Sequence, residues 1–127
     1  MAQGVDKQVC VLLVEDDKAL RRMLEVTLRR AGYQVITASD GLEAMNVAFS
    51  SPVDIVVTDA VMPNLSGQDV CRLVRSNPKL SHIKTILLSG LEREVGNPDR
   101  ELADAFLSKP VSQQDLKECI ERLLLSA

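Results

Sequence analysis

Short apolar runs alternate with amphipathic stretches along the chain. The first run, VCVLLV at Val9–Val14, is continuous and rich in β-branched residues, which is typical of a strand buried on both faces. From Lys18 to Ala31 apolar residues recur at helical spacing, and Gly32 follows as a helix-terminating residue. The same alternation predicts further strands at Gln34–Ala38, Ile55–Thr58, Ile83–Ser89 and Ala105–Ser108.

Helix signals lie between and after these strands. Asp40 is a candidate N-cap for a second helix. We expect the apolar side of that helix to comprise Leu42, Met45, Ala48 and Phe49.

Three more helical segments follow in the second half of the chain. One begins at Gly67 and ends near Asn77–Pro78, and the last begins after Ser112. Between them, Leu91–Asp104 is helical only in part, because Gly96–Pro98 interrupts it. Five strands alternating with five helical segments predict an α/β fold, a doubly wound five-stranded parallel sheet with helices on both faces.

Composition narrows the classes of function. The 127 residues suffice for one domain, which we place at 9–127 after a disordered or extended lead at 1–8. The net charge of −3, the absence of Trp and the lack of a basic stripe argue against a nucleic-acid partner. No apolar run reaches the roughly 18 residues that cross a membrane, and the polar start lacks the apolar core of a signal peptide.

The three cysteines lack the paired spacing of a metal site. Cys10, Cys71 and Cys119 each fall in an apolar periodic segment, so we expect reduced core residues. Reduced cysteines in a chain without a signal peptide indicate a cytoplasmic protein.

Charged and hydroxyl side chains follow four of the predicted strands. These are Glu15, Asp16 and Asp17 after the first strand, Asp59 at the third, Ser89 at the fourth and Lys109 after the fifth. Because the carboxyl ends of parallel strands share one edge of the sheet, these groups should meet there. Clustered carboxylates repel one another and raise each other's pKa values unless a cation such as Mg²⁺ neutralises them. An attacking carboxylate on Asp59, a cation from Lys109 and a hydroxyl from Ser89 are the parts needed for phosphoryl transfer.

Each of these residues also has an ordinary interpretation. Asp17 directly precedes a helix, so an N-cap is favoured over a metal ligand. Taken alone, Asp16 is equally well explained as a solvated loop carboxylate. For Lys109 taken alone, an ordinary surface lysine is the favoured interpretation, and Ser89 before Gly90 is also explained as a turn residue. The site is favoured because separate elements each place a suitable group at the same edge.

Four motifs resemble those of one family. They are VLLVEDD at Val11–Asp17, DAVMPNLSG at Asp59–Gly67, LLSG at Leu87–Gly90 and FLSKP at Phe106–Pro110. With these motifs the chain, from about Val9 to Leu125, resembles the receiver (response regulator) domain of two-component phosphorelay systems. The resemblance implies the flavodoxin-like strand order 2-1-3-4-5.

The resemblance also assigns roles at the site. It implies that Asp59 is the phosphoacceptor and that Asp16 binds Mg²⁺ directly, with Asp59 and the backbone carbonyl of Val61. Glu15 would act through water, and Mn²⁺ could substitute for Mg²⁺. Lys109 would bind the phosphoryl group.

Ser89 and Phe106 match the family's switch pair, in which a hydroxyl moves toward the phosphate and an aromatic ring turns inward. From sequence alone, Phe106 is equally well explained as a core residue. Gly90 stands where the family usually has alanine. Val61 and Leu91, which should flank the phosphate, are apolar, and we expect them to exclude water and slow dephosphorylation.

The implied partners are a histidine kinase or phosphotransfer protein as donor and a downstream effector protein or output domain. The interrupted segment after Ser89 puts a standard output face in doubt, and phosphorylation-dependent dimerisation is an open expectation. The chain would catalyse only its own phosphorylation and slow dephosphorylation, so it is not an enzyme in the usual sense. Two alternatives remain: a Mg²⁺-dependent phosphohydrolase, which would need an acid/base where Val61 stands, and a receiver that binds partners without phosphorylation.

Overall fold

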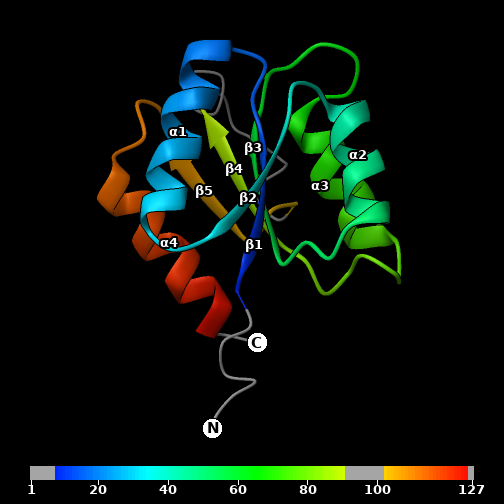
Figure 1. Cartoon of the computed structure of the whole chain (residues 1–127). Helices are drawn as coiled ribbons and strands as arrows, with labels where there is room; N and C mark the ends of the chain where they lie inside the picture. Colours follow the sequence, from blue (N-terminus) through cyan, green and yellow to red (C-terminus); the bar gives the residue numbers. More distant parts are fainter. Residues whose placement is uncertain (1–7, 91–101, 126–127) are drawn as a thin grey trace, which may run out of the picture.

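A five-stranded parallel sheet forms the centre of the molecule (Figure 1). The computed structural model describes residues 8–90 and 102–125. The strand order β2-β1-β3-β4-β5 confirms the predicted topology. The strands are β1 (Cys10–Val14), β2 (Gln34–Ala38), β3 (Ile55–Asp59), β4 (Lys84–Ser89) and β5 (Ala105–Ser108).

Helices cover both faces of the sheet, as predicted. The helices in the described ranges are α1 (Lys18–Arg30), α2 (Gly41–Ser50), α3 (Gly67–Ser76) and α4 (Gln113–Leu125). Figure 1 shows α1 and α4 on one face and α2 and α3 on the other. An interrupted helix was predicted within Leu91–Asp104, and residues 91–101 of that segment lie outside the described residues. Residues 1–7 of the predicted lead also lie outside them. Among the described residues, no helix has the length and apolar character needed to cross a membrane.

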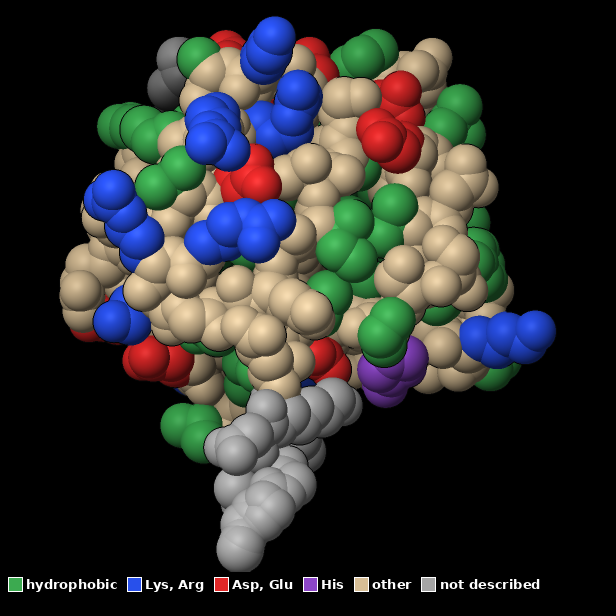
Figure 2. All heavy atoms as spheres, in the orientation of Figure 1, with side chains coloured by type: hydrophobic (Ala, Val, Ile, Leu, Met, Phe, Trp, Pro, Cys, Tyr) green, Lys and Arg blue, Asp and Glu red, His purple; other side chains and the backbone are tan. Residues whose placement is uncertain are grey.

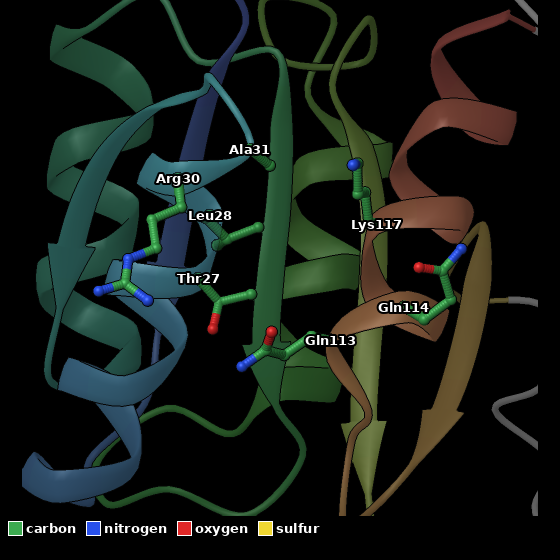
Figure 3. A pocket seen from close by; sticks show the side chains of 7 residues that line it. All are labelled: Thr27, Leu28, Arg30, Ala31, Gln113, Gln114 and Lys117. Atoms are coloured by element: carbon green, nitrogen blue, oxygen red, sulfur yellow. The ribbon is translucent and has the colours of Figure 1, made fainter.

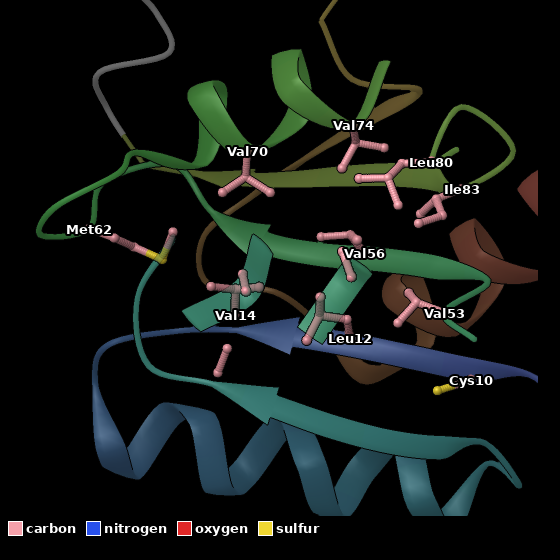
Figure 4. Close-up of a cluster of buried hydrophobic side chains, with 13 residues drawn as sticks. Cys10, Leu12, Val14, Val53, Val56, Met62, Val70, Val74, Leu80 and Ile83 are labelled. Carbon is pink, nitrogen blue, oxygen red and sulfur yellow. The ribbon is translucent and has the colours of Figure 1, made fainter. Parts of the chain in front are cut away.

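The core lies on both sides of the buried strands. Along β1, Leu12 and Val14 point with Val56 of β3 toward Val70 and Val74 of α3 (Figure 4). The alternate residues of the same strands pack against α1 and α4; this second cluster includes Val11, Leu13, Val57, Leu24, Leu28, Leu116 and Ile120. Continuous apolar runs are therefore required, because both faces of each central strand are covered.

Polar side chains cap every helix in the described ranges. Backbone N–H groups donate to Asp17 at 3.0 Å, Asp40 at 2.8 Å, Ser66 at 3.1 Å and Ser112 at 2.9 Å. The caps predicted at Asp17, Asp40 and Ser112 are confirmed. The favoured interpretation of Asp17 as a cap therefore holds.

The predicted apolar side of α2 is partly wrong. Leu42 and Phe49 are 56% and 54% exposed, whereas the buried positions are Gly41, Ala44 and Ala48. Small residues let α2 approach its neighbours closely, and the larger side chains beside them turn toward solvent. At Gly41 a Cβ would overlap the backbone of the loop before α3, so glycine is required there.

The prediction that the three cysteines are reduced core residues is confirmed. All three are buried and none is in a disulfide. Burial raises the pKa of the Cys71 thiol to about 12, so the unreactive protonated form dominates.

Candidate functional site

Three carboxylates meet at the carboxyl ends of β1 and β3. The two strands pair in parallel with Val14 opposite Thr58, so the next residues, Glu15 and Asp59, come side by side. With Asp16 they form a cluster in which one carboxylate oxygen from each residue lies within 4.8 Å of the other two. Glu15 and Asp59 are buried, at 1% and 5% exposure, while Asp16 is exposed. The predicted acidic cluster is therefore present.

Lys109 reaches this cluster from the end of β5. Its Nζ lies 2.9 Å from Oδ1 of Asp59 and 3.6 Å from Oε1 of Glu15. The backbone N–H of Lys109 donates to the carbonyl of Ser89 at 2.8 Å, which ties the two strand ends together. Burial alone lowers the pKa of Lys109, but the hydrogen bond to Asp59 and the negative charges of Glu15 and Asp59 outweigh it and raise that pKa. Lys109 is thus a fully charged partner of the cluster at neutral pH.

The carboxyl group of Glu15 has a raised pKa. Burial raises the pKa of Glu15 to about 7, and the charge on Asp59 adds to this rise. The backbone N–H of Asp17, which donates to Oε2 at 3.1 Å, and the charge of Lys109 act in the opposite direction. The predicted repulsion between carboxylates contributes to the raised pKa of Glu15, but desolvation by burial is the larger cause. The sequence does not reveal this, because burial of Glu15 depends on packing above the sheet edge.

Two buried oxygens at the site have no hydrogen-bond partner within the described structure: Oε1 of Glu15 and Oγ of Ser89. Leaving a buried polar group unsatisfied costs about 1–3 kcal/mol. Ser89 ends β4, directly after the residue that pairs with Asp59. Oε1 of Glu15 faces the ammonium group of Lys109 at 3.6 Å, beyond hydrogen-bond distance. Both atoms therefore lie where a bound cation and an oxygen-rich ligand would complete their hydrogen bonds or coordination.

Phe106 lies on β5 and is partly buried against Ala60, Cys71, Leu87 and Ala103. This contact places the ring beside the segment that follows Asp59. This intermediate burial agrees both with Phe106 as the aromatic residue of a switch and with Phe106 as an ordinary core residue.

Two residues that support the site were not singled out for that role from the sequence. Gly67 lies so close to Asp59 that a Cβ would overlap the Asp59 carbonyl, and its N–H donates to Ala60 at 3.0 Å. Arg21 of α1 donates from Nη1 to the backbone carbonyl of Glu15 at 2.8 Å. Gly67 belongs to the motif DAVMPNLSG, so the sequence offered a signal for it. The hydrogen bond of Arg21 is made to a backbone carbonyl, which every residue has, so no sequence pattern predicts it.

The donor set suits a hard divalent cation. Carboxylate oxygens at a partly open site are the ligands typical of Mg²⁺, which retains waters and accepts a phosphate oxygen. The unsatisfied Oε1 of Glu15 and the exposed carboxylate of Asp16 fit such an ion. The side chain of Val61 is 63% exposed, and the role of its backbone carbonyl stays a prediction.

The model of the response regulator receiver domain family matches residues 11–121. The chain belongs to this family. The receiver domain is 38% identical over 119 residues to the probable transcriptional regulator ycf27 of Guillardia theta, a match that covers 90% of this chain and 44% of that protein. It is 30% identical over 113 residues to protein PilG of Pseudomonas aeruginosa, covering 87% and 84% of the two chains.

This receiver domain is also similar to solved structures. The response regulator protein TrrA of Thermotoga maritima, in complex with Mg²⁺ and BeF, has a TM-score of 0.83 at 31% identity and covers 91% of this receiver domain and 99% of that chain. The chain spans about half the length of the curated transcriptional regulators that it matches. It is a signalling domain, homologous to phosphorelay response regulators.

Proposed function

We propose that this receiver domain accepts a phosphoryl group on Asp59 and changes its surface in response. The observation that carries the proposal is the buried Asp59 carboxylate, 2.9 Å from Lys109 and within an acidic cluster. A buried nucleophile beside a cation and an unsatisfied hydroxyl is suited to form and hold an acyl phosphate.

Mg²⁺ is the proposed cofactor, with Mn²⁺ as a substitute. Asp16 and Asp59 would hold it together with the carbonyl of Val61, and Glu15 would act through water. When bound, Mg²⁺ would neutralise the carboxylates and the charge on the phosphoryl oxygens. The Mg²⁺ and BeF named with the TrrA structure support this choice.

The proposed donor is a phosphohistidine on a histidine kinase or phosphotransfer protein. A carboxylate oxygen of Asp59 attacks phosphorus, the new O–P bond forms, and the N–P bond breaks with its electron pair passing to the imidazole. Lys109, which pairs with Asp59 in the unphosphorylated protein, then faces a phosphoryl oxygen. The receiver turns over no separate substrate.

The response to phosphorylation would begin at Ser89 and Phe106. A phosphoryl group adds a charge of about −1.5 to −2 and new acceptor oxygens. The unsatisfied Oγ of Ser89 is a ready donor to such an oxygen, and Phe106 packs next to the chain that would follow. The altered surface would bind an effector protein or output domain or promote dimerisation. A cytoplasmic location stays a prediction.

The proposal is tested by incubating the protein with acetyl phosphate and Mg²⁺ and measuring intact mass. We expect one added phosphoryl group, lost in Asp59→Asn and in excess EDTA. Rapid turnover of phosphoesters would instead support the phosphohydrolase alternative. Absence of labelling with acetyl phosphate and with a panel of histidine kinases would support a receiver that works through binding alone.

A further inference from the structure

The segment between β3 and α3 leaves the sheet directly after Asp59 and is closed at its base. We name residues 60–66 the β3–α3 loop. The N–H of Gly67 donates across this loop to the carbonyl of Ala60 at 3.0 Å. The loop carries the backbone carbonyl of Val61, which we propose as a metal ligand. Its conformation therefore decides how that carbonyl is placed relative to the Asp59 carboxylate.

The first half of the β3–α3 loop is anchored in the core. Met62 is 9% exposed and belongs to the same buried cluster as Val14 and Val70 (Figure 4). The hydroxyl of Thr58 lies 3.9 Å from its sulfur. Apolar packing therefore fixes the loop at Met62, and the second half of the loop needs a separate anchor.

The second half of the loop turns at Asn64. Among the described residues, Asn64 is the only non-glycine residue with a positive φ, at 70°. Asparagine adopts this left-handed conformation more readily than most residues, because its short amide forms local hydrogen bonds. Here the amide bonds to a distant segment: Nδ2 donates to Oδ2 of Asp40, 24 positions earlier in the chain, at 3.2 Å.

The carboxylate of Asp40 serves two segments at once. Its Oδ1 accepts from the N–H of Glu43 at 2.8 Å and caps α2, while its Oδ2 accepts from Asn64. The next residue, Gly41, lies so close to the backbone of Leu65 that a Cβ would overlap it. The start of α2 therefore holds the second half of the loop both by a hydrogen bond and by direct contact.

The bond between Asn64 and Asp40 adds nothing to the capping of α2. Oδ1 of Asp40 already satisfies the N–H of Glu43, and the Glu43 carboxylate in turn accepts from the N–H of Ser39 at 2.8 Å. What the bond does fix is the position of Asn64, three residues after Val61. Its effect therefore falls on the loop and on the groups that the loop presents.

We propose that Asn64 and Asp40 are positioning residues that hold the β3–α3 loop so that the Val61 carbonyl and the Asp59 carboxylate face the same cation. The inference rests on the proposed function, because it concerns the same metal site. Neither residue is assigned to the metal or to the phosphoryl group, and both act through the loop. An ordered loop raises metal affinity, because binding then costs less conformational entropy.

Two single substitutions should each release the loop from α2. Asp40→Ser keeps a cap for α2 but removes the acceptor for Asn64. Asn64→Asp keeps a residue that tolerates a left-handed backbone but places two carboxylates against each other. The double variant, Asp40→Asn with Asn64→Asp, swaps donor and acceptor, so both the hydrogen bond and the net charge return. This swapped pair should restore what either single substitution loses.

Two measurements without a phosphodonor follow the loop. Amide hydrogen exchange in EDTA follows the N–H groups of Leu65 and Gly67, which donate within the loop. Both should exchange about threefold faster in either single variant, as expected for loss of one hydrogen bond. Calorimetric titration with MgCl₂ should show about threefold weaker binding to Asp40→Ser. The swapped pair should match the wild type in both measurements.

Two control variants separate positioning from charge and from general stability. Glu43→Gln removes the same charge at the start of α2, where Figure 2 shows acidic side chains together, but its side chain bonds Ser39 and not the loop. Leu28→Val removes packing on the opposite face of the sheet. Leu28 is buried and lines one of two adjoining cavities, of about 220 and 320 Å³, between α1 and α4 (Figure 3). Leu28→Val should lower the urea midpoint, and neither control should change loop exchange or Mg²⁺ affinity.

Three outcomes would overturn the inference: loop exchange in Asp40→Ser equal to that of the wild type, equal Mg²⁺ affinity of Asp40→Ser and Glu43→Gln, or a swapped pair as loose as Asn64→Asp. Failure of the proposed function gives a different result. A wild type that binds no Mg²⁺, with loop exchange that rises in the single variants and returns in the swapped pair, would defeat the proposed cofactor and still support the tether between Asn64 and Asp40.

Discussion

The ammonium group of Lys109 lies 2.9 Å from Oδ1 of Asp59. Asp59 ends β3 and Lys109 directly follows β5, and β4 lies between these two strands in the sheet. The length of the lysine side chain spans that strand, and the backbone bond from Lys109 to Ser89 holds its base in place. In the absence of metal, Lys109 is the cation that compensates the two buried carboxylates.

Replacing Lys109 by methionine should separate metal binding from phosphorylation. Without the ammonium group the cluster is more negative, so Mg²⁺ should bind about tenfold more tightly, as expected for removal of a like charge at short range. Acetyl phosphate labelling of Asp59 should fall, because the phosphoryl group loses its cationic partner. Calorimetric titration with Mg²⁺ at constant ionic strength measures the first effect, with Lys79→Met as control. Unchanged Mg²⁺ affinity would contradict the role given to Lys109.

Metal-free stability should fall as pH rises from about 4.5 to about 7. The folded-state pKa of Glu15 is raised from 4.5 to about 7, so the folded protein holds a proton that the unfolded chain releases. The loss is complete above the folded pKa and should be on the order of 3 kcal/mol. Urea denaturation in EDTA at pH 5 and pH 8 measures it. Glu15→Gln should flatten the profile, and a profile of equal slope in that variant would rule out Glu15 as the cause.

The three cysteines should resist thiol reagents in the folded protein. Burial raises the pKa of all three thiols, that of Cys71 to about 12, and the thiolate is the reactive form. We expect no reaction with Ellman's reagent in native buffer and three equivalents after denaturation. A fast native phase assigned to Cys71 by mass spectrometry would contradict the described burial.

Gly67→Ala should damage both the fold and the site. The added Cβ would overlap the Asp59 carbonyl, so α3 or the end of β3 must shift. Such overpacking costs about 1–3 kcal/mol, and the labelling of Asp59 should fall with it. Gln68→Ala, at the next position of the same helix, is the control and should change both by little. Full labelling of Gly67→Ala would show that the site tolerates this shift.

Polar residues at positions 61 and 91 should shorten the life of the acyl phosphate. Val61 follows Asp59 closely and is 63% exposed, so an asparagine there could orient water toward the phosphoryl group; Leu91 lies outside the described residues. The double variant Val61→Asn, Leu91→Asn should lose phosphate several-fold faster after removal of the donor, as followed by intact mass. An unchanged lifetime would end the idea that these apolar residues exclude water.

The local pattern of apolar and polar residues was sufficient to predict the strands and most of the helices. Alternation of apolar runs and helical repeats acts over a few residues, and the caps at Asp17, Asp40 and Ser112 depend on neighbours three positions away. The meeting of Asp16, Asp59 and Lys109 also followed from sequence, because parallel strands must place their carboxyl ends at one edge.

Packing between distant segments decided the rest. The exposure of Phe49 depends on which face α2 turns toward the rest of the protein, and the raised pKa of Glu15 depends on its burial beside Asp59 and Lys109. The two cavities between α1 and α4 exist only because two helices more than 80 residues apart in sequence lie side by side on the sheet. Periodicity within the chain determined which faces are apolar, whereas the contacts between elements determined which side chains water still reaches.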